Sequence, residues 1–417
     1  MPLKPAGLTR EELAEKDTLD PLGAYRARFA LPEGVIYLDG NSLGAMPRAT
    51  PRRIAEVLEQ EWAVGLVRSW NTAGWIDLGA RVGDKIARLI GAVSDSVVVA
   101  DSTSINLFKL LAGALSLRPG RQVILSETGN FPSDLYVAQG LRDLLQRGHR
   151  LHTVGAGQIL DHLDENVAVV MLTQVNYHTG QRLDMAAITR AAHRVGALVI
   201  WDLAHSAGAM PIDLTADEVD FAVGCGYKYL NGGPGAPAFL YIAPRLQDAF
   251  CTPVAGWLGH AQPFAFEADY RPAKGIRRAI VGTPPILSLA ALEVGVDLAL
   301  EVDLRSVREK STAQTRVLAD LIEQRCQGYG LQRSSPRDPE LGGSQVCFTH
   351  PHAYAIMQAL IAHGVIGDFR APDVLRFGIT PLYLSYGELW DAVSVLEQIL
   401  REDIWRAREY QVRQAVT

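Results

Sequence analysis

Two ionisable side chains follow apolar runs that are typical of buried strands. Asp202 comes directly after Val199-Ile-Trp, and Lys228 comes after the run 221–226 and before the glycine-rich stretch 230–235. A carboxylate at the end of a buried strand needs a partner to stay ionised, and burial favours the neutral amine of a lysine. A neutral lysine amine can form a Schiff base and an aspartate can hold a pyridinium nitrogen, so the pair predicts a site for pyridoxal phosphate.

Each of these two residues also has a plainer interpretation. Asp202 can cap the helix that follows it. A lysine beside a glycine-rich loop, such as Lys228, is more often at the protein surface. The occurrence of both residues at neighbouring strand ends is what favours the cofactor site.

A run of hydroxyl side chains suits a phosphate group. Ser102, Thr103 and Ser104 precede an expected helix, so their hydroxyls and the free backbone N–H groups converge where the helix dipole favours an anion. Helix capping alone explains one of the three hydroxyls but not the run. Phe131 also stands at a helix start, where its ring could lie over a planar cofactor, although an aromatic side chain there is more often part of the core.

The elements that position these residues alternate strand, polar loop and helix from about residue 96 onward. Continuous β-branched runs between helices predict an α/β fold with a mostly parallel sheet covered on both faces. Ligands of such a sheet bind at the carboxyl ends of its strands, which selects loops 101–104 and 131–134, Thr173 and Asp202. We expect strands at 97–100, 122–125, 167–172, 197–201, 221–226 and 238–242, and helices at 107–115, 135–145 and 186–195.

Helical patterns come before the predicted sheet. The N-terminal stretch up to about residue 30 is charged and helix-prone, and Thr9-Arg-Glu-Glu resembles a helix cap. Apolar residues recur at helical spacing in 51–64 and 77–93. Between them we expect a polar loop with two tryptophans, 68–75, for which a structural role and a functional role are about equally compatible with the pattern.

A smaller domain is expected toward the C-terminal end. The Gly-, Pro- and aromatic-rich stretch 253–285 is typical of a functional loop or an interface. After helical patterns at 287–303 and 306–327, short strands and helices alternate, which indicates an α+β domain. We place the large domain at 46–295 and the small domain at 1–45 together with 296–417.

Composition and charge narrow the class of protein. With 417 residues, 48% apolar and 21% charged, the chain is typical of a soluble globular protein, long enough for about two or three domains. A net charge of −6 gives no basic surface for nucleic acid. The sequence shows neither a secretory pattern nor an apolar run of membrane-spanning length, so we expect a cytoplasmic protein that contacts no membrane.

The cysteines show no metal or disulfide pattern. They are scattered without CxxC spacing and without a nearby histidine pair. We therefore expect no metal site and no disulfide framework, and we interpret all of them as reduced packing thiols: Cys225, Cys251, Cys326 and Cys347.

Several motifs together resemble the kynureninase family, pyridoxal-phosphate hydrolases of the aspartate aminotransferase-like fold (fold type I, class-V aminotransferase group). They are Asp202-Leu-Ala-His205, Gly226-Tyr-Lys-Tyr-Leu-Asn-Gly-Gly-Pro-Gly235, Phe131-Pro-Ser-Asp134, Tyr37-Leu-Asp-Gly-Asn-Ser-Leu-Gly44 and Gly256-Trp-Leu-Gly-His260. The first is shared with cysteine desulfurases, whereas its combination with the third and the last is specific. The resemblance covers most of the chain.

The resemblance implies an activity and a cofactor. Kynureninases hydrolyse the Cβ–Cγ bond of L-kynurenine to anthranilate and L-alanine in tryptophan degradation, a route that leads to catabolism or to NAD synthesis. By position, Lys228 would be the Schiff-base lysine, Asp202 the pyridinium partner and Phe131 the stacking ring. The implied phosphate ligands are Thr103, Ser104 and Tyr227, and the rest of the cofactor shell is Asp134, Thr173 and His205.

Other implied roles concern the reaction and its substrate. Lys228 would take the substrate's α-proton, and Tyr227 would assist the addition of water as acid and base. Arg376 would hold the substrate carboxylate as a bidentate fork, with Arg370 as a rival for that role.

Two positions carry implications for assembly and specificity. Trp257 and Thr283 resemble residues that reach the cofactor or substrate of a neighbouring subunit, which implies a homodimer with shared sites. Trp70 and Thr283 stand where some members carry a His and an Asn suited to a ring hydroxyl. They imply a preference for L-kynurenine over 3-hydroxykynurenine.

The sequence leaves two alternative functions open. The nearer one is another pyridoxal-phosphate enzyme of the same fold, a cysteine desulfurase or a transaminase. A desulfurase needs a mobile nucleophilic cysteine, and Cys347 lies instead in a strand-like context, Gln345-Val-Cys-Phe. The other is a catalytically inactive dimeric scaffold protein, against which the intact Lys228, Asp202 and Arg376 argue.

Overall fold

The computed structural model describes residues 8–414 of the chain. Contacts between residues divide it into two compact units. The large unit consists of 49–177 and 183–301, and the small unit consists of the residues up to 48, 178–182 and those from 302 onward. Residues 1–7, part of the helix-prone N-terminal stretch, lie outside the described residues.

The expected large domain, 46–295, agrees with the large unit to within a few residues at each end. One internal segment was not expected to leave it. The short segment 178–182 belongs to the small unit although the large unit flanks it on both sides. Gln181 forms an antiparallel bridge with Gly342, and the N–H of Gly343 donates to the carbonyl of Gly180 over 2.7 Å. Backbone pairing therefore ties this segment to the C-terminal part of the chain.

A seven-stranded sheet forms the centre of the large unit, in the order β2-β8-β7-β6-β5-β3-β4. β8 runs antiparallel to both of its neighbours, and the pairings among the other strands are parallel. The mostly parallel α/β sheet predicted from the β-branched runs is thus confirmed. The strands are β2 (Val97–Val99), β3 (Val123–Glu127), β4 (Arg150–Val154), β5 (Val167–Thr173), β6 (Leu198–Asp202), β7 (Phe221–Gly224) and β8 (Phe239–Ile242).

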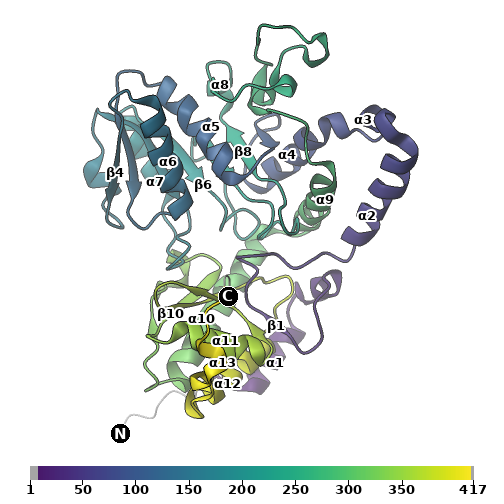
Figure 1. Cartoon of the computed structure of the whole chain (residues 1–417). Coiled ribbons are helices and arrows are strands. Elements are labelled where there is room, and N and C mark those ends of the chain that lie inside the picture. Colours follow the sequence, from purple (N-terminus) through teal and green to yellow (C-terminus); the bar gives the residue numbers. More distant parts are fainter. Residues whose placement is uncertain (1–7, 415–417) are drawn as a thin grey trace. The chain divides into compact units, whose positions relative to one another are not determined.

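Helices cover this sheet (Figure 1). Ser102 caps α5, Asp184 caps α7, and α6 begins with Pro132, which are residue types that helix starts favour. Leu107, Leu110 and Leu111 of α5 pack on strand residues such as Ile200 and Phe221 to form the core. The helices are α4 (Leu78–Leu89), α5 (Thr103–Ser116), α6 (Pro132–Leu145), α7 (Met185–Arg194), α8 (Pro244–Gln247) and α9 (Ile286–Leu300).

The stretch before α4 differs from the expectation. The helix expected over 51–64 is α2 (Thr50–Glu56) continued by a π-helix (Val57–Gly65). The expected polar loop 68–75 is wrong, because most of it is helical, including α3 (Ser69–Thr72). Glu61 fixes the fold of this stretch: its carbonyl accepts from the Ser69 hydroxyl at 2.5 Å, and its carboxylate accepts from the indole N–H of Trp75 at 2.6 Å.

The small unit contains a four-stranded sheet in the order β12-β13-β10-β9, with antiparallel neighbours throughout. A separate parallel pair joins β1 (Ile36–Tyr37) to β11 (Val365–Ile366). The sheet strands are β9 (Gln332–Arg333), β10 (Gln345–Thr349), β12 (Asp368–Arg370) and β13 (Val374–Gly378), and the helices are α1 (Arg10–Thr18), α10 (Leu304–Arg325), α11 (Ala353–Ala362), α12 (Tyr386–Arg401) and α13 (Arg408–Gln411).

Capping explains how α1 and α12 begin and meet. Thr9 forms a capping box with Glu12, as its sequence predicts, and Ser385 forms one with Glu388. Asp17 of α1 accepts hydrogen bonds from the first N–H groups of α12, at 2.6 and 2.8 Å. The N-terminal helix is thereby joined to the C-terminal part of the small unit.

Two features are absent from the part of the chain that the structure describes. Between residues 8 and 414, no helix combines the length and apolar character that a membrane crossing needs. Within the same residues, no group of three or more His, Cys, Asp or Glu side chains is arranged to hold a metal ion.

Candidate active site

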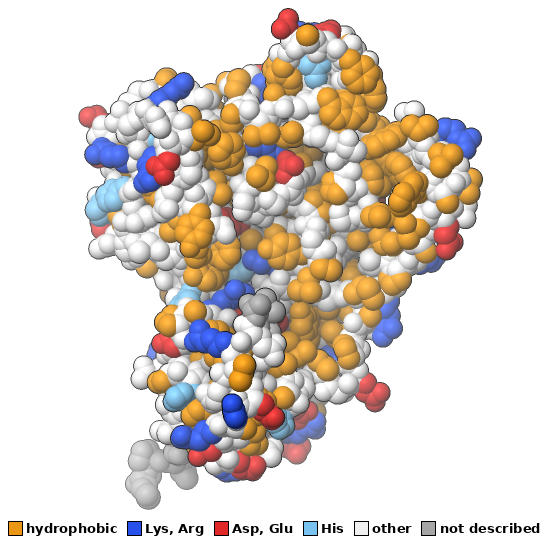
Figure 2. All heavy atoms as spheres, in the orientation of Figure 1, with side chains coloured by type: hydrophobic (Ala, Val, Ile, Leu, Met, Phe, Trp, Pro, Cys, Tyr) orange, Lys and Arg blue, Asp and Glu red, His pale blue; other side chains and the backbone are white. Residues whose placement is uncertain are grey.

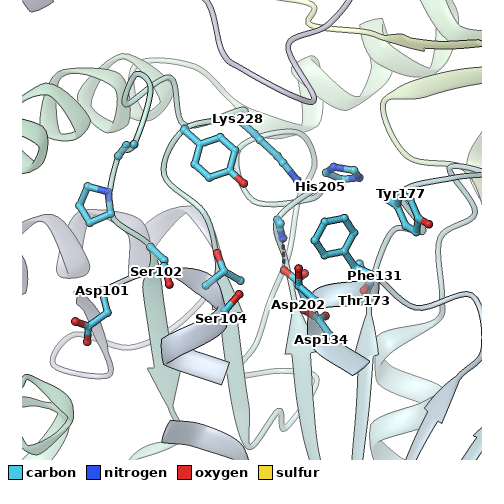
Figure 3. A pocket seen from close by; sticks show the side chains of 18 of the residues that line it. Asp101, Ser102, Ser104, Phe131, Asp134, Thr173, Tyr177, Asp202, His205 and Lys228 are labelled. Carbon is cyan, nitrogen blue, oxygen red and sulfur yellow. Dashed lines mark hydrogen bonds between the residues drawn. The ribbon is translucent and has the colours of Figure 1, made fainter. Parts of the chain in front are cut away.

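A cavity of about 690 Å³ opens at the carboxyl ends of the strands of the large unit (Figure 3). Ligands of an open α/β sheet bind at this edge, because loops and helix N-termini converge there. Nine residues that were expected to surround the cofactor line it: Thr103, Ser104, Phe131, Asp134, Thr173, Asp202, His205, Tyr227 and Lys228.

Asp202 ends β6 at the floor of this cavity, with 5% of its surface exposed. Its carboxylate accepts a hydrogen bond from the N–H of Ala204 over 2.7 Å, which fixes its direction (Figure 3). Burial raises the pKa of Asp202, and the charge of Lys228 and the Ala204 N–H oppose that rise. A buried carboxylate in this position is stabilised by a cationic N–H partner in the cavity.

Asp134 lies in the first turn of α6 beside Asp202 (Figure 3). Burial raises its pKa well above the usual range, and the charge of Asp202 raises it further, while Lys228 opposes both effects. Among the described residues, its Oδ2 has no hydrogen-bond partner. A buried polar atom in that state calls for a partner from a ligand.

Lys228 follows β7 on a tightly folded glycine-rich loop. The N–H of Gly232 returns to the carbonyl of Gly226 over 2.9 Å, and a Cβ on Gly226 would lie 2.5 Å from the carbonyl oxygen of Pro237. The lysine Nζ lies 6.0 Å from the ring centroid of Phe131 and 5.8 Å from that of Tyr227. In Figure 3 it extends across the cavity above Asp202.

The ring of Phe131 is held from two sides. Its backbone N–H donates to Oδ1 of Asn130 over 2.7 Å, and the hydroxyl of Thr173 donates to the same oxygen. The ring of Tyr177 meets it edge-on, with centroids 5.2 Å apart. The aromatic ring is therefore fixed at the side of the cavity instead of lying in the core.

The hydroxyl residues 102–104 at the N-terminus of α5 have different roles. Ser102 is the N-cap, and its hydroxyl accepts from the N–H of Ile105 at 3.4 Å. Thr103 and Ser104 form the first turn and line the cavity, where the helix dipole favours an anion. The chemistry of this end of the cavity fits a phosphate group.

Four expected site residues do not line this cavity. Trp257 is 37% exposed and contacts Phe264 edge-on, and Thr283 is exposed. Trp70 packs edge-on against Trp75, with centroids 5.8 Å apart. Arg376 belongs to the small unit, in β13, where it pairs with Asp368. The first three therefore do not contribute to the cavity of their own chain.

The structure adds three residues that the sequence did not single out. Tyr177 lines the cavity, Asn130 orients Phe131 and Thr173, and Lys109 pairs with the cavity residue Asp101. Tyr177 lies in the loop that follows β5, and this position could have been used to predict that it lines the cavity. Lys109 interrupts the apolar face of a helix, which could have been used in the same way. Asn130 carried no distinguishing pattern.

The residues present fit pyridoxal phosphate in each part of the cavity. An amine can bond to its aldehyde, and buried acids can accept from its ring nitrogen. An aromatic ring can stack on it, and a helix N-terminus can hold its phosphate. The unpartnered oxygen of Asp134 is the observation that most directly asks for a group in this place.

Comparison with known proteins agrees with the motifs. The family model of the kynureninase C-terminal domain matches residues 307–396. Kynureninases of Pseudomonas fluorescens and of Burkholderia mallei strain ATCC 23344 are each 51% identical over 414 residues, covering 98% of this chain and 100% of theirs.

Solved structures with a similar fold include a cysteine desulfurase from Thermococcus onnurineus NA1, with a TM-score of 0.77 and 19% identity over 91% of this chain and 98% of that one. Another is a C-DES mutant with glycine covalently linked to its pyridoxal-phosphate cofactor, with a TM-score of 0.75 and 19% identity over 89% of this chain and 98% of that one. These likenesses confirm fold type I. By its near-full-length identity to its relatives, the chain belongs to the kynureninase family of pyridoxal-phosphate enzymes.

Proposed function

We propose that the protein hydrolyses L-kynurenine to anthranilate and L-alanine. The observation that carries this proposal is the meeting of Lys228, Asp202 and Asp134 in one cavity, where both buried acids have raised pKa values. Membership of the kynureninase family supports the identity of the substrate. The same membership supports a role in tryptophan degradation, with a product that serves catabolism or NAD biosynthesis, and we infer a cytoplasmic location from the absence of a secretory pattern in the sequence.

The chain's own residues would hold the cofactor from four directions. Asp202 would keep the ring nitrogen protonated, with Asp134 beside it as a second acid whose pKa is raised by burial. Phe131 would stack on the ring. Thr103 and Ser104 at the helix N-terminus would hold the phosphate together with Tyr227, and Thr173 and His205 would complete the shell.

Two side chains would move protons during the reaction. Pyridoxal phosphate supplies an aldehyde that captures the substrate amine and an electron sink that stabilises charge on the neighbouring carbons. The amine of Lys228 would take the α-proton, and the phenol of Tyr227 would assist the addition of water to the γ-carbonyl as acid and base. Their closeness, with the Lys228 Nζ 5.8 Å from the centroid of the Tyr227 ring, suits two groups that serve the α-carbon and the γ-carbonyl, which lie two bonds apart.

The substrate would be selected by residues outside this cavity. Arg376 would bind its carboxylate as a guanidinium–carboxylate ion pair. Trp70 and Thr283 offer no pair of groups matched to a ring hydroxyl, which supports a preference for L-kynurenine over 3-hydroxykynurenine. Equal kcat/KM values for the two compounds would contradict this preference.

We further infer a homodimer in which Trp257 and Thr283 reach the partner's cofactor or substrate, since neither lines the cavity of its own chain. Figure 2 shows apolar side chains gathered over the arm formed by α2, the π-helix and α3. Those with large exposed fractions are Trp62 at 57%, Val64 at 61%, Leu66 at 56% and Val67 at 76%. An apolar surface of this kind is typical of an interface.

The burial of Cys347 argues against the alternative function, that of a cysteine desulfurase. This thiol lies within β10, wholly buried, and burial raises its pKa to about 12, an effect that the charge of Arg376 reduces. A thiol in that state cannot act as a mobile nucleophile. Release of sulfide from L-cysteine at a rate comparable to kynurenine cleavage would reverse this conclusion.

The activity test follows anthranilate fluorescence after L-kynurenine is added to the purified holoenzyme. We expect production of anthranilate together with visible absorption of the bound cofactor. Lys228→Ala should lose both activity and the absorption of the lysine-bound cofactor. A matched control is Lys85→Ala, a lysine on the outer side of α4 that pairs with Glu293. A purified wild-type protein without visible cofactor absorption would contradict the proposal.

A further inference from the structure

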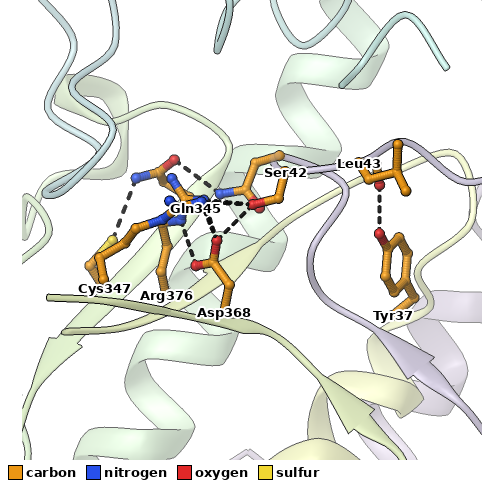
Figure 4. Close-up of polar contacts among 9 residues, drawn as sticks. Tyr37, Ser42, Leu43, Gln345, Cys347, Asp368 and Arg376 are labelled. Carbon is orange, nitrogen blue, oxygen red and sulfur yellow. Dashed lines mark hydrogen bonds and ion pairs between the residues drawn. The ribbon is translucent and has the colours of Figure 1, made fainter. Parts of the chain in front are cut away.

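In the small unit, the buried carboxylate of Asp368 accepts hydrogen bonds from two arginine side chains, and Figure 4 shows its contacts with Arg376. Asp368 and Arg376 lie directly opposite each other on β12 and β13. The Nε of Arg376 donates to Oδ1 of Asp368 over 2.8 Å, and its Nη2 donates to Oδ2. Arg370 donates to Oδ2 as well, over 2.6 Å. Parallel bonds from Nε and Nη2 to the two oxygens fix the plane of the Arg376 guanidinium.

Ser42 joins all three charged groups. Its hydroxyl donates to Oδ2 of Asp368 over 2.6 Å. The same hydroxyl oxygen accepts from Nη2 of Arg376 at 2.7 Å and from Nη2 of Arg370 at 3.1 Å. Ser42 therefore helps to fix the position of the Arg376 Nη2, which also donates to Asp368.

The loop that carries Ser42 is fitted closely onto the strand that carries Arg376. The N–H of Gly378 donates to the carbonyl of Leu38 over 2.6 Å. A Cβ on Gly378 would lie 2.1 Å from Oδ1 of Asn41, so only glycine allows this approach. The loop and strand are thus held as one piece, with Ser42 placed by the backbone.

Charge accompanies this geometry. Burial alone would raise the pKa of Asp368, but the charges and hydrogen bonds of Arg376 and Arg370 bring it below the usual range. Burial likewise would lower the pKa of Arg376, and Asp368 raises it overall. Two arginines therefore face the paired carboxylate of Asp368. Asp39 is a further acid of this cluster, and burial together with the charge of Asp368 raises its pKa to about 7. While Asp39 is protonated, the cluster has an excess positive charge that suits an anionic ligand.

We propose that Asp368 and Ser42 are the positioning residues of Arg376, and that they hold its guanidinium in the orientation that binds the carboxylate of an α-amino acid. The inference rests on the proposed function, which assigns substrate binding to Arg376. Five N–H donors are available to an arginine, and this network uses Nε and both donors of Nη2. The orientation of the Nη1 end is fixed as a result.

The test uses L-alanine as a simple α-amino acid ligand. It is titrated into the holoenzyme, and its dissociation constant is obtained from the change in cofactor absorption, with no turnover required. We expect Ser42→Ala to weaken L-alanine binding about tenfold, the loss typical of a hydrogen bond to a charged group. Asp368→Asn, which removes the paired charge, should weaken it by about 100-fold.

Controls separate positioning from folding. Ser311→Ala makes the same chemical change at another buried serine of the small unit, whose hydroxyl bonds to Ser344 over 2.7 Å, and it should leave L-alanine binding unchanged. Cofactor content and thermal midpoint are measured for every variant. If Asp368→Asn does not fold, Ser42→Ala decides the question, because it retains all three charges.

The direction of the change distinguishes the possible roles of Asp368. Tighter L-alanine binding in Asp368→Asn would show that this carboxylate competes with the ligand, and unchanged binding in both variants would show a purely structural role. Either result overturns the proposal. A wild-type protein that binds L-alanine in this Ser42-dependent manner but does not cleave L-kynurenine would refute the proposed function while leaving the positioning role intact.

Discussion

Lys109 and Asp101 form an ion pair of 2.8 Å between Nζ and Oδ2, with the lysine side chain wholly buried in α5. The same Nζ donates to the carbonyl of Ala279, also over 2.8 Å. Burial lowers the pKa of Lys109, and Asp101 opposes that change. One lysine thus joins the phosphate end of the cavity to the segment that leads toward Thr283.

Lys109→Met should destabilise the protein because it leaves Asp101 without its partner while filling nearly the same volume. We expect the free energy of unfolding to fall by about 2 kcal/mol, because the carbonyl of Ala279 also loses its buried donor, whereas Asp101 is partly reached by solvent. Lys85→Met is the control, since Glu293 retains Arg81 as a partner, and it should cost less than about 1 kcal/mol. Urea denaturation of both variants checks this, and equal losses would refute it.

Asp134 should make the cofactor-free protein less stable as pH rises. Its folded-state pKa is raised, so the folded chain keeps a proton that an unfolded carboxyl loses above about pH 4. Stability from this group is full below that pH and declines as pH rises toward the folded pKa. Thermal midpoints of Asp134→Asn should therefore fall less with pH than those of wild type.

The matched control for this experiment is Asp143→Asn on the same helix, because that carboxyl is exposed and its pKa is lowered by a hydrogen bond from Arg142. It should keep the pH dependence of the wild type. If Asp134→Asn also kept that slope, Asp134 would not hold an extra proton in the folded cofactor-free state.

Asp39 should make ligand binding in the small unit depend on pH. Burial and the charge of Asp368 raise its pKa to about 7, while Ser42, Arg376 and Arg370 oppose that rise. Because ionised Asp39 cancels the excess positive charge of the cluster, L-alanine affinity should decline as pH rises through about 7. Asp39→Asn should remove this decline.

The measurement is the dissociation constant of L-alanine in the holoenzyme across this pH range. Tyr37, the other titratable group nearby, has its pKa raised by burial, by Asp39 and by Asp368, so it stays protonated throughout. An identical pH profile in Asp39→Asn and wild type would assign the titration elsewhere, for example to the ligand amine.

The thiols should differ sharply in reactivity. Cys251 is exposed, whereas the other three are buried, and burial raises the pKa of Cys326 and Cys347 to about 12. Native protein should therefore react with a single equivalent of a thiol reagent such as Ellman's reagent, and Cys251→Ser should abolish that reaction. Cys347→Ala should retain kynurenine cleavage, and loss of cleavage in a folded variant would contradict a purely structural role for this thiol.

The α/β part of the fold could be predicted because its strands are continuous apolar runs. Val167–Thr173 is buried at every position, and such runs between helices have few other structures available. The same rule located Asp202 and the hydroxyl run beside one cavity. The strands β4, β9, β11 and β12 were missed. In β9 and β11 two residues show no periodicity, and their pairing depends on distant partners.

Longer-range contacts explain the other failures. The stretch that holds Trp75 looked polar, but a single carboxylate, that of Glu61, folds it back into helical turns. Asp368 was not singled out in the sequence, because nothing local marks it as the carboxylate between two arginines. Roles that depend on such contacts become visible only when the chain is folded.

The edge position of β2 has a consequence for the order in which the enzyme is made. Among the described strands, β2 pairs only with β8, which the ribosome completes much later than β2 itself. A nascent chain that ends after Lys228 already contains the lysine and both acids, but its phosphate-binding helix start has no neighbouring strand to join. The strand that leads into α5 can therefore join the sheet only after β8 has been made, so we expect stable cofactor binding to require the chain through the end of β8.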